Sequence, residues 1–125
     1  MSNELKVFKR IWELSKDSPY MAKMEKPDAV FEGKNTSCGD WIEVSLKCKK
    51  GKIMQGRFLH TGCAVSAVAT SVLLEYLEGK TFAALQKISP EKHLALFGAP
   101  VSPARLACAL LPLEILRTGK KKAGA

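Results

Sequence analysis

The spacing of hydrophobic and polar positions changes twice along the chain. From Glu4 to Ser15 apolar residues recur at helical spacing, which predicts an amphipathic N-terminal helix. Trp41 to Lys49 instead alternates strictly between apolar and polar residues. Ile53 to Leu59 follows it across a Lys-Gly-Lys turn, so we predict an antiparallel hairpin at about 41–60. Residues 20–37 show neither spacing, and we expect a long loop there.

Beyond the hairpin, start and stop signals mark a series of helices. An apolar run beginning at Cys63 ends at Gly79, and Thr81 is placed to cap a short helix. Ser89-Pro90 and Ser102-Pro103 each combine an N-cap residue with a first-turn proline, which predicts two further helices. A helix, a loop, a hairpin and then helices indicate an α+β fold, with a small antiparallel sheet packed against helices.

The composition is that of one globular domain. A chain of 125 residues with 46% hydrophobic content can bury a core without disulfides, so we expect one domain over residues 1–118 and a basic, disordered tail over 119–125. The first residues carry charges rather than a secretory apolar run, and no stretch is long enough to cross a membrane. We therefore expect a cytoplasmic protein, in which the four cysteines are free, metal-bound or catalytic.

The net charge of +8 raises the question of nucleic-acid binding. However, the basic residues are scattered, and no stacking aromatic residues are interleaved with them as single-strand binders require. We expect neither a nucleic-acid nor a membrane partner, and the charge favours an acidic protein partner instead.

Two of the cysteines lie in or just before the predicted hairpin. Cys48 shares the inward face of its strand with Val44 and Leu46, which indicates a small buried hydrophobic residue. Cys38 lies in the segment NTSCGDW, where a glycine permits a sharp turn and Asp40 places a carboxylate two residues from the thiol. This segment is a candidate half-site.

The other two cysteines lie on predicted helices. Cys63 begins a helix, where free N–H groups and the helix dipole favour a thiolate. Cys108 follows Arg105 by three residues, and the guanidinium would favour a thiolate if the two share a face. No C-x-x-C pair is present, so the spacing leaves open a three-cysteine metal site and the burial of at least one cysteine.

Three motifs in order give a more specific signal. They are "CGD" entering a strand, "GKIMQGRFLHTGCAVSAVATSVLLEYLEGK" running from a strand into a helix, and "PARLACALL" around the third cysteine. With these motifs the segment from Cys38 to about Leu116 resembles the IscU/SufU/NifU N-terminal family of iron-sulfur cluster assembly scaffolds. "SPYMAKM" is similar, more weakly, to an early arm of that family.

The resemblance implies that Cys38, Cys63 and Cys108 bind a transient [2Fe-2S] cluster or iron, with Asp40 as the nearby carboxylate. It implies a scaffold, rather than an enzyme in the strict sense, that receives sulfur from a cysteine desulfurase and passes the cluster to apo iron-sulfur proteins. Cys108 would accept the sulfur as a persulfide, and Arg105 would stabilise its thiolate. One carboxylate among thiolates makes a weaker, exchangeable ligand, which suits a cluster that must be handed on.

Two departures from the family keep a second function open. IscU-type members carry a histidine immediately before the third cysteine, where this chain has Ala107. The stretch ARLACA is closer to the SufU branch, yet the chain has no room for the insertion of that branch. The alternative is therefore a zinc-dependent SufU-like sulfurtransferase that holds Zn²⁺ on the same residues, and a bare interaction module is a third. His60 is an alternative fourth ligand or a hydrogen-bonded strand-end residue, and His93 is predicted at the surface.

Overall fold

The computed structural model describes residues 2–16, 18–35, 39–98 and 100–118, with residues 2–8 described by their backbone alone. Cys38 and the predicted tail 119–125 lie outside the described residues. In chain order the elements are α1 (Ser2–Lys16), β1 (Ala29–Asn35), β2 (Asp40–Lys49), β3 (Lys52–Thr61), α2 (Ala64–Leu77), α3 (Phe82–Gln86), α4 (Pro90–Phe97), the 3-10 helix η1 (Pro103–Arg105) and α5 (Leu106–Thr118).

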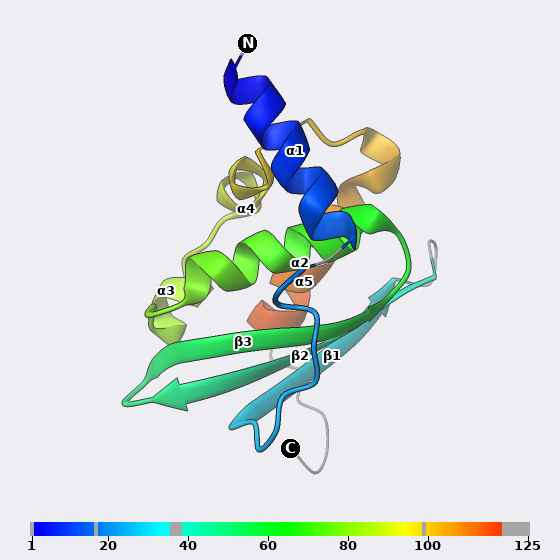
Figure 1. Cartoon of the computed structure of the whole chain (residues 1–125). Coiled ribbons are helices and arrows are strands. Elements are labelled where there is room, and N and C mark those ends of the chain that lie inside the picture. Colours follow the sequence, from blue (N-terminus) through cyan, green and yellow to red (C-terminus); the bar gives the residue numbers. More distant parts are fainter. Residues whose placement is uncertain (1, 17, 36–38, 99, 119–125) are drawn as a thin grey trace.

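Helices and sheet form separate layers. Figure 1 shows α2 and α5 against one face of the sheet, with α1 and α4 on the far side of α2. Strand β3 contacts α2, and β1 contacts α5. This arrangement confirms the predicted α+β class. Within the described residues, no helix is both long and apolar enough to cross a bilayer.

The sheet has the order β1-β2-β3 and is antiparallel throughout. The predicted hairpin corresponds to β2 and β3, which confirms that part of the prediction. Strand β1 was expected to be loop, and that expectation is wrong. Its neighbours Val30 and Phe31 are both buried although their side chains point to opposite faces, so the strand shows no alternation of polarity. Pro27 and Gly33 strengthen the false loop signal.

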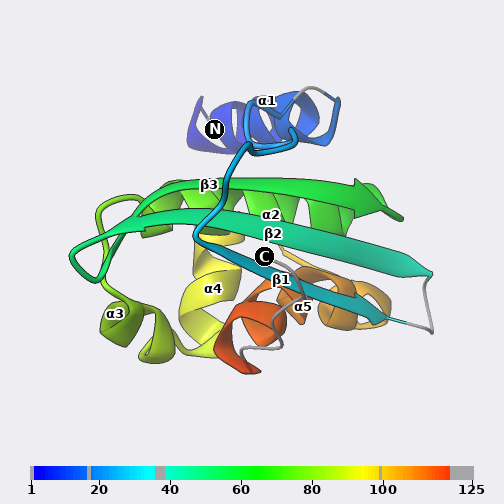
Figure 2. The same ribbon diagram turned by 90° about the horizontal axis from the view of Figure 1, so that it is seen from below.

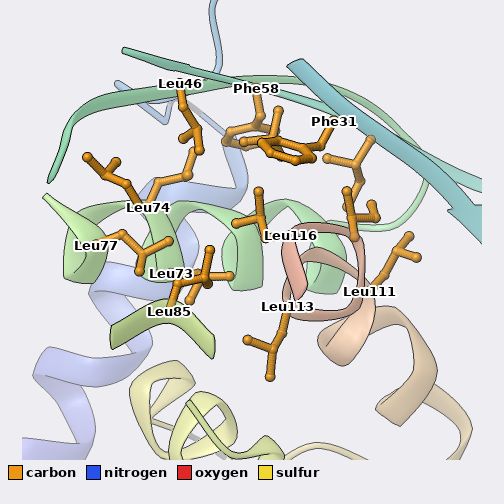
Figure 3. Packing of buried hydrophobic residues seen from close by; sticks show 14 of the residues in the cluster. Phe31, Leu46, Phe58, Leu73, Leu74, Leu77, Leu85, Leu111, Leu113 and Leu116 are labelled. Atoms are coloured by element: carbon orange, nitrogen blue, oxygen red, sulfur yellow. The ribbon is translucent and has the colours of Figure 1, made fainter. Parts of the chain in front are cut away.

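The main core lies between the sheet and the α2–α5 layer. Figure 3 shows leucines of α2 and α5, with one from α3, converging on Phe31, Leu46 and Phe58 of the three strands. Helix α2 is buried on nearly all sides, because α1 and α4 cover the face that the sheet does not. The N-terminal ends of α2 and α5, which lie near the start of β2, are therefore held by this packed layer.

The predicted helix caps are present at two of the later helices. Thr81 accepts a hydrogen bond from the N–H of Ala84 at 3.1 Å, and Ser89 accepts one from Lys92 at 3.0 Å. Gly98 ends α4 in the left-handed conformation, with φ 81°. Ser102-Pro103 begins a 3-10 turn, and α5 itself begins only at Leu106.

An arm of residues 18–28 connects α1 to the sheet. Ser18 is buried and its hydroxyl lies 2.7 Å from that of Ser71 on α2. The carbonyl of Tyr20 accepts a hydrogen bond from the N–H of Phe58 at 2.8 Å, so the arm covers part of the outer edge of β3. Figure 2 shows the arm then crossing the face of the sheet opposite the helices to reach β1.

Candidate metal centre

Three elements that are far apart in the sequence meet at one end of the sheet. Asp40 begins β2, Cys63 is the N-cap of α2, and Cys108 lies in the first turn of α5. A carboxylate oxygen and the two sulfur atoms all lie within 4.8 Å of one another. Ligand atoms around a tetrahedral zinc–thiolate ion are about 3.8 Å apart, so a small contraction would bring this set to bonding distance.

Asp40 is almost fully buried, with only 1% of it exposed, and hydrogen bonds hold its carboxylate in place. Its Oδ1 accepts a hydrogen bond from the backbone N–H of Cys63 at 2.8 Å, and the Cys63 thiol lies 3.7 Å from Oδ2. Burial alone raises the pKa of Asp40. Hydrogen bonds from the Cys108 side chain and from Cys63 outweigh that effect and leave the pKa below its usual value. The group is therefore a carboxylate at neutral pH, as a metal ligand must be.

Gly62 allows Asp40 and Cys63 to approach this closely. Its φ of +135° is rarely adopted by residues with a side chain, and a Cβ at this position would lie 2.8 Å from the Cα of Asp40 and even closer to the carboxylate Oδ1. The glycine before Cys63 is thus required both by its backbone conformation and by the space that Asp40 occupies.

Cys108 is fully buried, whereas Cys63 is partly exposed. The side-chain amide of Asn35, at the end of β1, lies 4.0 Å from the Cys108 sulfur. Arg105 ends the 3-10 helix one turn earlier and is exposed. Its role as a thiolate stabiliser stays a prediction. Asn35 was not predicted, because its place beside Cys108 depends on the pairing of β1, which the sequence did not reveal.

His60 and Ser66 form a second layer behind Cys63. His60 Nε2 lies 2.7 Å from the Ser66 hydroxyl, which also donates to the Cys63 carbonyl at 3.0 Å and lies 3.8 Å from the Cys63 sulfur. Burial lowers the pKa of His60, although the Asp40 carboxylate opposes the shift. Among the described residues, His60 is outside the group formed by Asp40, Cys63 and Cys108. Its hydrogen bond holds Ser66, whose buried position behind Cys63 was not predicted from the sequence.

Two further residues differ from the sequence-based expectation. A bulge at Lys47 and Cys48 shifts the strand register, so Cys48 packs against the core but is only partly buried. It lies on β2 at the end opposite Asp40, away from the centre. His93 is not a surface residue: 1% of it is exposed, and its Nε2 lies 2.7 Å from the carbonyl oxygen of Ala109.

The fold and these donors define a small α+β protein with a candidate site for a soft metal ion or an iron-sulfur cluster. Two thiols and one carboxylate, with Asp40 and Cys108 buried, suit ions that prefer sulfur ligands. The chain belongs to the family described as NifU-like N terminal domain, which matches residues 9–122. This confirms the family predicted from the three motifs.

Individual relatives fall into the two branches that the sequence suggested. The iron-sulfur cluster assembly scaffold protein IscU of Thermotoga maritima is 26% identical over 90% of this chain and 90% of its own length. The zinc-dependent sulfurtransferase SufU of Bacillus subtilis is 26% identical over 74% of this chain and 75% of its own. A crystal structure of a candidate iron-sulfur cluster assembly scaffold for the SUF system of Fervidobacterium islandicum has a TM-score of 0.76 at 28% identity, covering 89% and 93% of the two chains.

Proposed function

We propose that this chain is an iron-sulfur cluster assembly scaffold. The observation that carries the proposal is the convergence of Asp40, Cys63 and Cys108 from three elements onto one point. In this function the cluster is cargo: a [2Fe-2S]-type cluster is built on the two cysteines together with Cys38, receives its sulfur from a cysteine desulfurase and passes to apo iron-sulfur proteins. Membership of the NifU-like family and the scaffold name of the Thermotoga relative support this function.

The donor set suits cargo that must leave again. Thiolates bind iron and zinc strongly, whereas a single carboxylate is a weaker ligand. The same Asp40 oxygens already accept hydrogen bonds from Cys63, so the protein can take back the carboxylate when the cargo departs. Asp40 is therefore the proposed exchangeable ligand.

Sulfur transfer to the scaffold is a thiol exchange without net oxidation. A cysteine thiolate of the scaffold attacks the outer sulfur of the desulfurase persulfide. A new S–S bond forms as the old one breaks, and the desulfurase cysteine leaves as a thiolate. The resemblance assigns this step to Cys108, yet Cys108 is fully buried and Cys63 is partly exposed. For Cys108 to take the sulfur, the first turn of α5 has to open.

A zinc-dependent sulfurtransferase is the second candidate. Ala107 occupies the position at which IscU-type members carry a histidine, and the relative from Bacillus subtilis is a zinc-dependent sulfurtransferase. The donors that we propose for iron would equally hold Zn²⁺, which takes three sulfurs and one oxygen in tetrahedral geometry. One thiolate would then be released from the metal to accept sulfur.

Anaerobic reconstitution separates the two functions. The purified chain is incubated with ferrous iron, cysteine and a cysteine desulfurase, and its absorption spectrum is recorded alongside metal analysis of the protein as purified. A brown chromophore that transfers to an apo-ferredoxin is the expected result. Stoichiometric, tightly bound zinc that blocks cluster formation would contradict the scaffold function and favour the sulfurtransferase. Failure to bind either metal would exclude both.

Matched cysteine variants test the assignment of the site. Cys63→Ser should lower metal or cluster loading at least tenfold, because it removes a central sulfur ligand. Cys48→Ser should leave loading unchanged, since Cys48 lies at the opposite end of β2. Equal losses in the two variants would show that the site is elsewhere.

A further inference from the structure

His93 joins helix α4 to the turn that carries Cys108. It lies in the middle of α4, and its Nε2 is 2.7 Å from the carbonyl oxygen of Ala109, the residue directly after Cys108. Both His93 and Ala109 are buried, at 1% and 0% exposed. Helix α4 is held in place by packing against α2 as well as α5, and Ser89 caps its start. The imidazole therefore ties a fixed helix to the peptide next to a candidate ligand.

The contact with a carbonyl defines the state of the ring. A carbonyl oxygen only accepts hydrogen bonds, so Nε2 carries the proton and donates. In the neutral ring Nδ1 is then an acceptor, and it is buried with no hydrogen-bond partner among the described residues. An unmatched buried acceptor costs free energy, which an apolar side chain of similar size would avoid. The histidine is thus explained by the single bond that it donates, and less well by packing.

The turn that receives this bond has a weakness of its own. Pro112 lies within α5 and has no N–H, so it cannot supply the helical hydrogen bond that residue 112 would give to the carbonyl of residue 108. A donor from outside the helix, one residue further along, is well placed to hold this turn. The bond from His93 enters at Ala109, between Cys108 and Pro112.

We propose that His93 is a positioning residue for Cys108. Its hydrogen bond to the Ala109 carbonyl fixes the first turns of α5, and so keeps the Cys108 sulfur within reach of Asp40 and Cys63. The local effect on α5 is a property of the fold, whereas its consequence for metal binding rests on the proposed function.

Four forms of the full chain test this role: wild type, His93→Leu, His93→Gln and Phe97→Leu. Leucine removes the donor, and glutamine retains a side-chain N–H at comparable reach. Phe97 lies on the same helix and in the same apolar cluster as Ala109, so Phe97→Leu loosens the packing of α4 while leaving the hydrogen bond. Two quantities are measured: amide hydrogen exchange of residues 106–113 in metal-free protein, and Zn²⁺ affinity by competition with a chelator.

His93→Leu should speed exchange in 106–113 at least tenfold more than in α2, and weaken Zn²⁺ binding at least tenfold. His93→Gln should restore most of the slow exchange in 106–113 and most of the Zn²⁺ affinity. Phe97→Leu should neither speed exchange selectively in 106–113 nor weaken Zn²⁺ binding. Equal effects of His93→Leu and Phe97→Leu, or no rescue by glutamine, would contradict the proposal and show that His93 acts through packing alone. If wild type binds neither zinc nor a cluster, the proposed function fails, and the exchange data alone still decide whether His93 fixes the turn.

Discussion

Gly62 has a backbone conformation and a neighbour that both exclude a side chain. We predict that Gly62→Ala lowers the free energy of unfolding by about 2–4 kcal/mol, because the alanine is strained at positive φ and its Cβ displaces Asp40. The same displacement should weaken Zn²⁺ binding. Urea denaturation in the presence of a chelator measures the first effect, and chelator competition the second.

Gly79 supplies the matched control for this substitution. It also has a positive φ, of 81°, but an added Cβ would meet nothing within 4 Å. Gly79→Ala should therefore show only the conformational cost, about 1–2 kcal/mol, with unchanged zinc affinity. A Gly62→Ala variant that behaves like Gly79→Ala would mean that Asp40 tolerates the displacement.

Ser66 connects His60 to both the carbonyl and the sulfur of Cys63. We predict that Ser66→Ala weakens Zn²⁺ binding by about threefold to tenfold, because Cys63 loses the hydroxyl that holds it, a loss of the order of one hydrogen bond. Ser71 is the control: it is equally buried on the same helix but contacts Ser18 of the arm. Ser71→Ala should cost similar stability and leave zinc affinity intact. Loss of affinity in both would point to a general weakening of α2.

Sequence reasoning could group Cys63, Cys108 and Asp40 as candidate ligands because the order of their motifs resembles that of a known family, and the structure brings the three together. It could not place Asn35, Ser66 or His93, whose roles depend on contacts between distant segments. His93 in particular follows a cap-and-proline signal on a short helix, and only the packing of α4 against α5 shows that it is buried. Local patterns identify candidate ligands, whereas the residues that hold these candidates in place emerge from tertiary packing.

Strand β1 and helix α5 approach each other across Gly33. A Cβ at Gly33 would lie 2.6 Å from Cγ1 of Ile115, so Gly33→Ala should lower the free energy of unfolding by about 1–3 kcal/mol through overpacking. Ile115→Ala removes the atom that the new methyl would meet. In the Ile115→Ala background, Gly33→Ala should therefore cost less than half as much.

A double-mutant cycle by urea denaturation measures this coupling. Additive effects would show that β1 and α5 move apart freely.

The contact between Gly33 and Ile115 also explains why β1 was not predicted. A strand that needs glycine to admit a helix, and that has buried neighbours on opposite faces, matches loop statistics better than strand statistics. The helices were predicted well because serine, threonine, proline and glycine at their ends act locally, without help from the rest of the fold.

Acid should destabilise the whole protein through its two histidines. Burial lowers the pKa of both His60 and His93 below the usual value of about 6.5. Above that pH the rings are neutral in the folded and unfolded chains, so their contribution is constant. As the pH falls below about 6.5, the unfolded chain takes up protons first and the free energy of unfolding decreases, until the folded-state pKa is reached.

We predict that wild type loses stability between pH 7.5 and 5.5, with His93 contributing up to about 1.4 kcal/mol per pH unit below 6.5. His93→Gln cannot titrate and should flatten that decline. Urea denaturation at three pH values in a chelator measures it, with His60→Gln as a parallel variant. An unchanged slope in His93→Gln would show that His93 has the same pKa in the folded and unfolded chains, and would contradict the effect of burial.

The meeting of β2, α2 and α5 at one point links the occupancy of the site to the lifetime of the protein. A ligand that binds only the folded chain adds about 2.7 kcal/mol of stability when its concentration is a hundred times the dissociation constant. In the proposed function, each delivery of cargo withdraws that contribution and removes one link between the sheet and two helices. A chain that is refilled quickly stays resistant to proteases, and one that stays empty is degraded, so the cellular level of this protein should follow the supply of iron and sulfur.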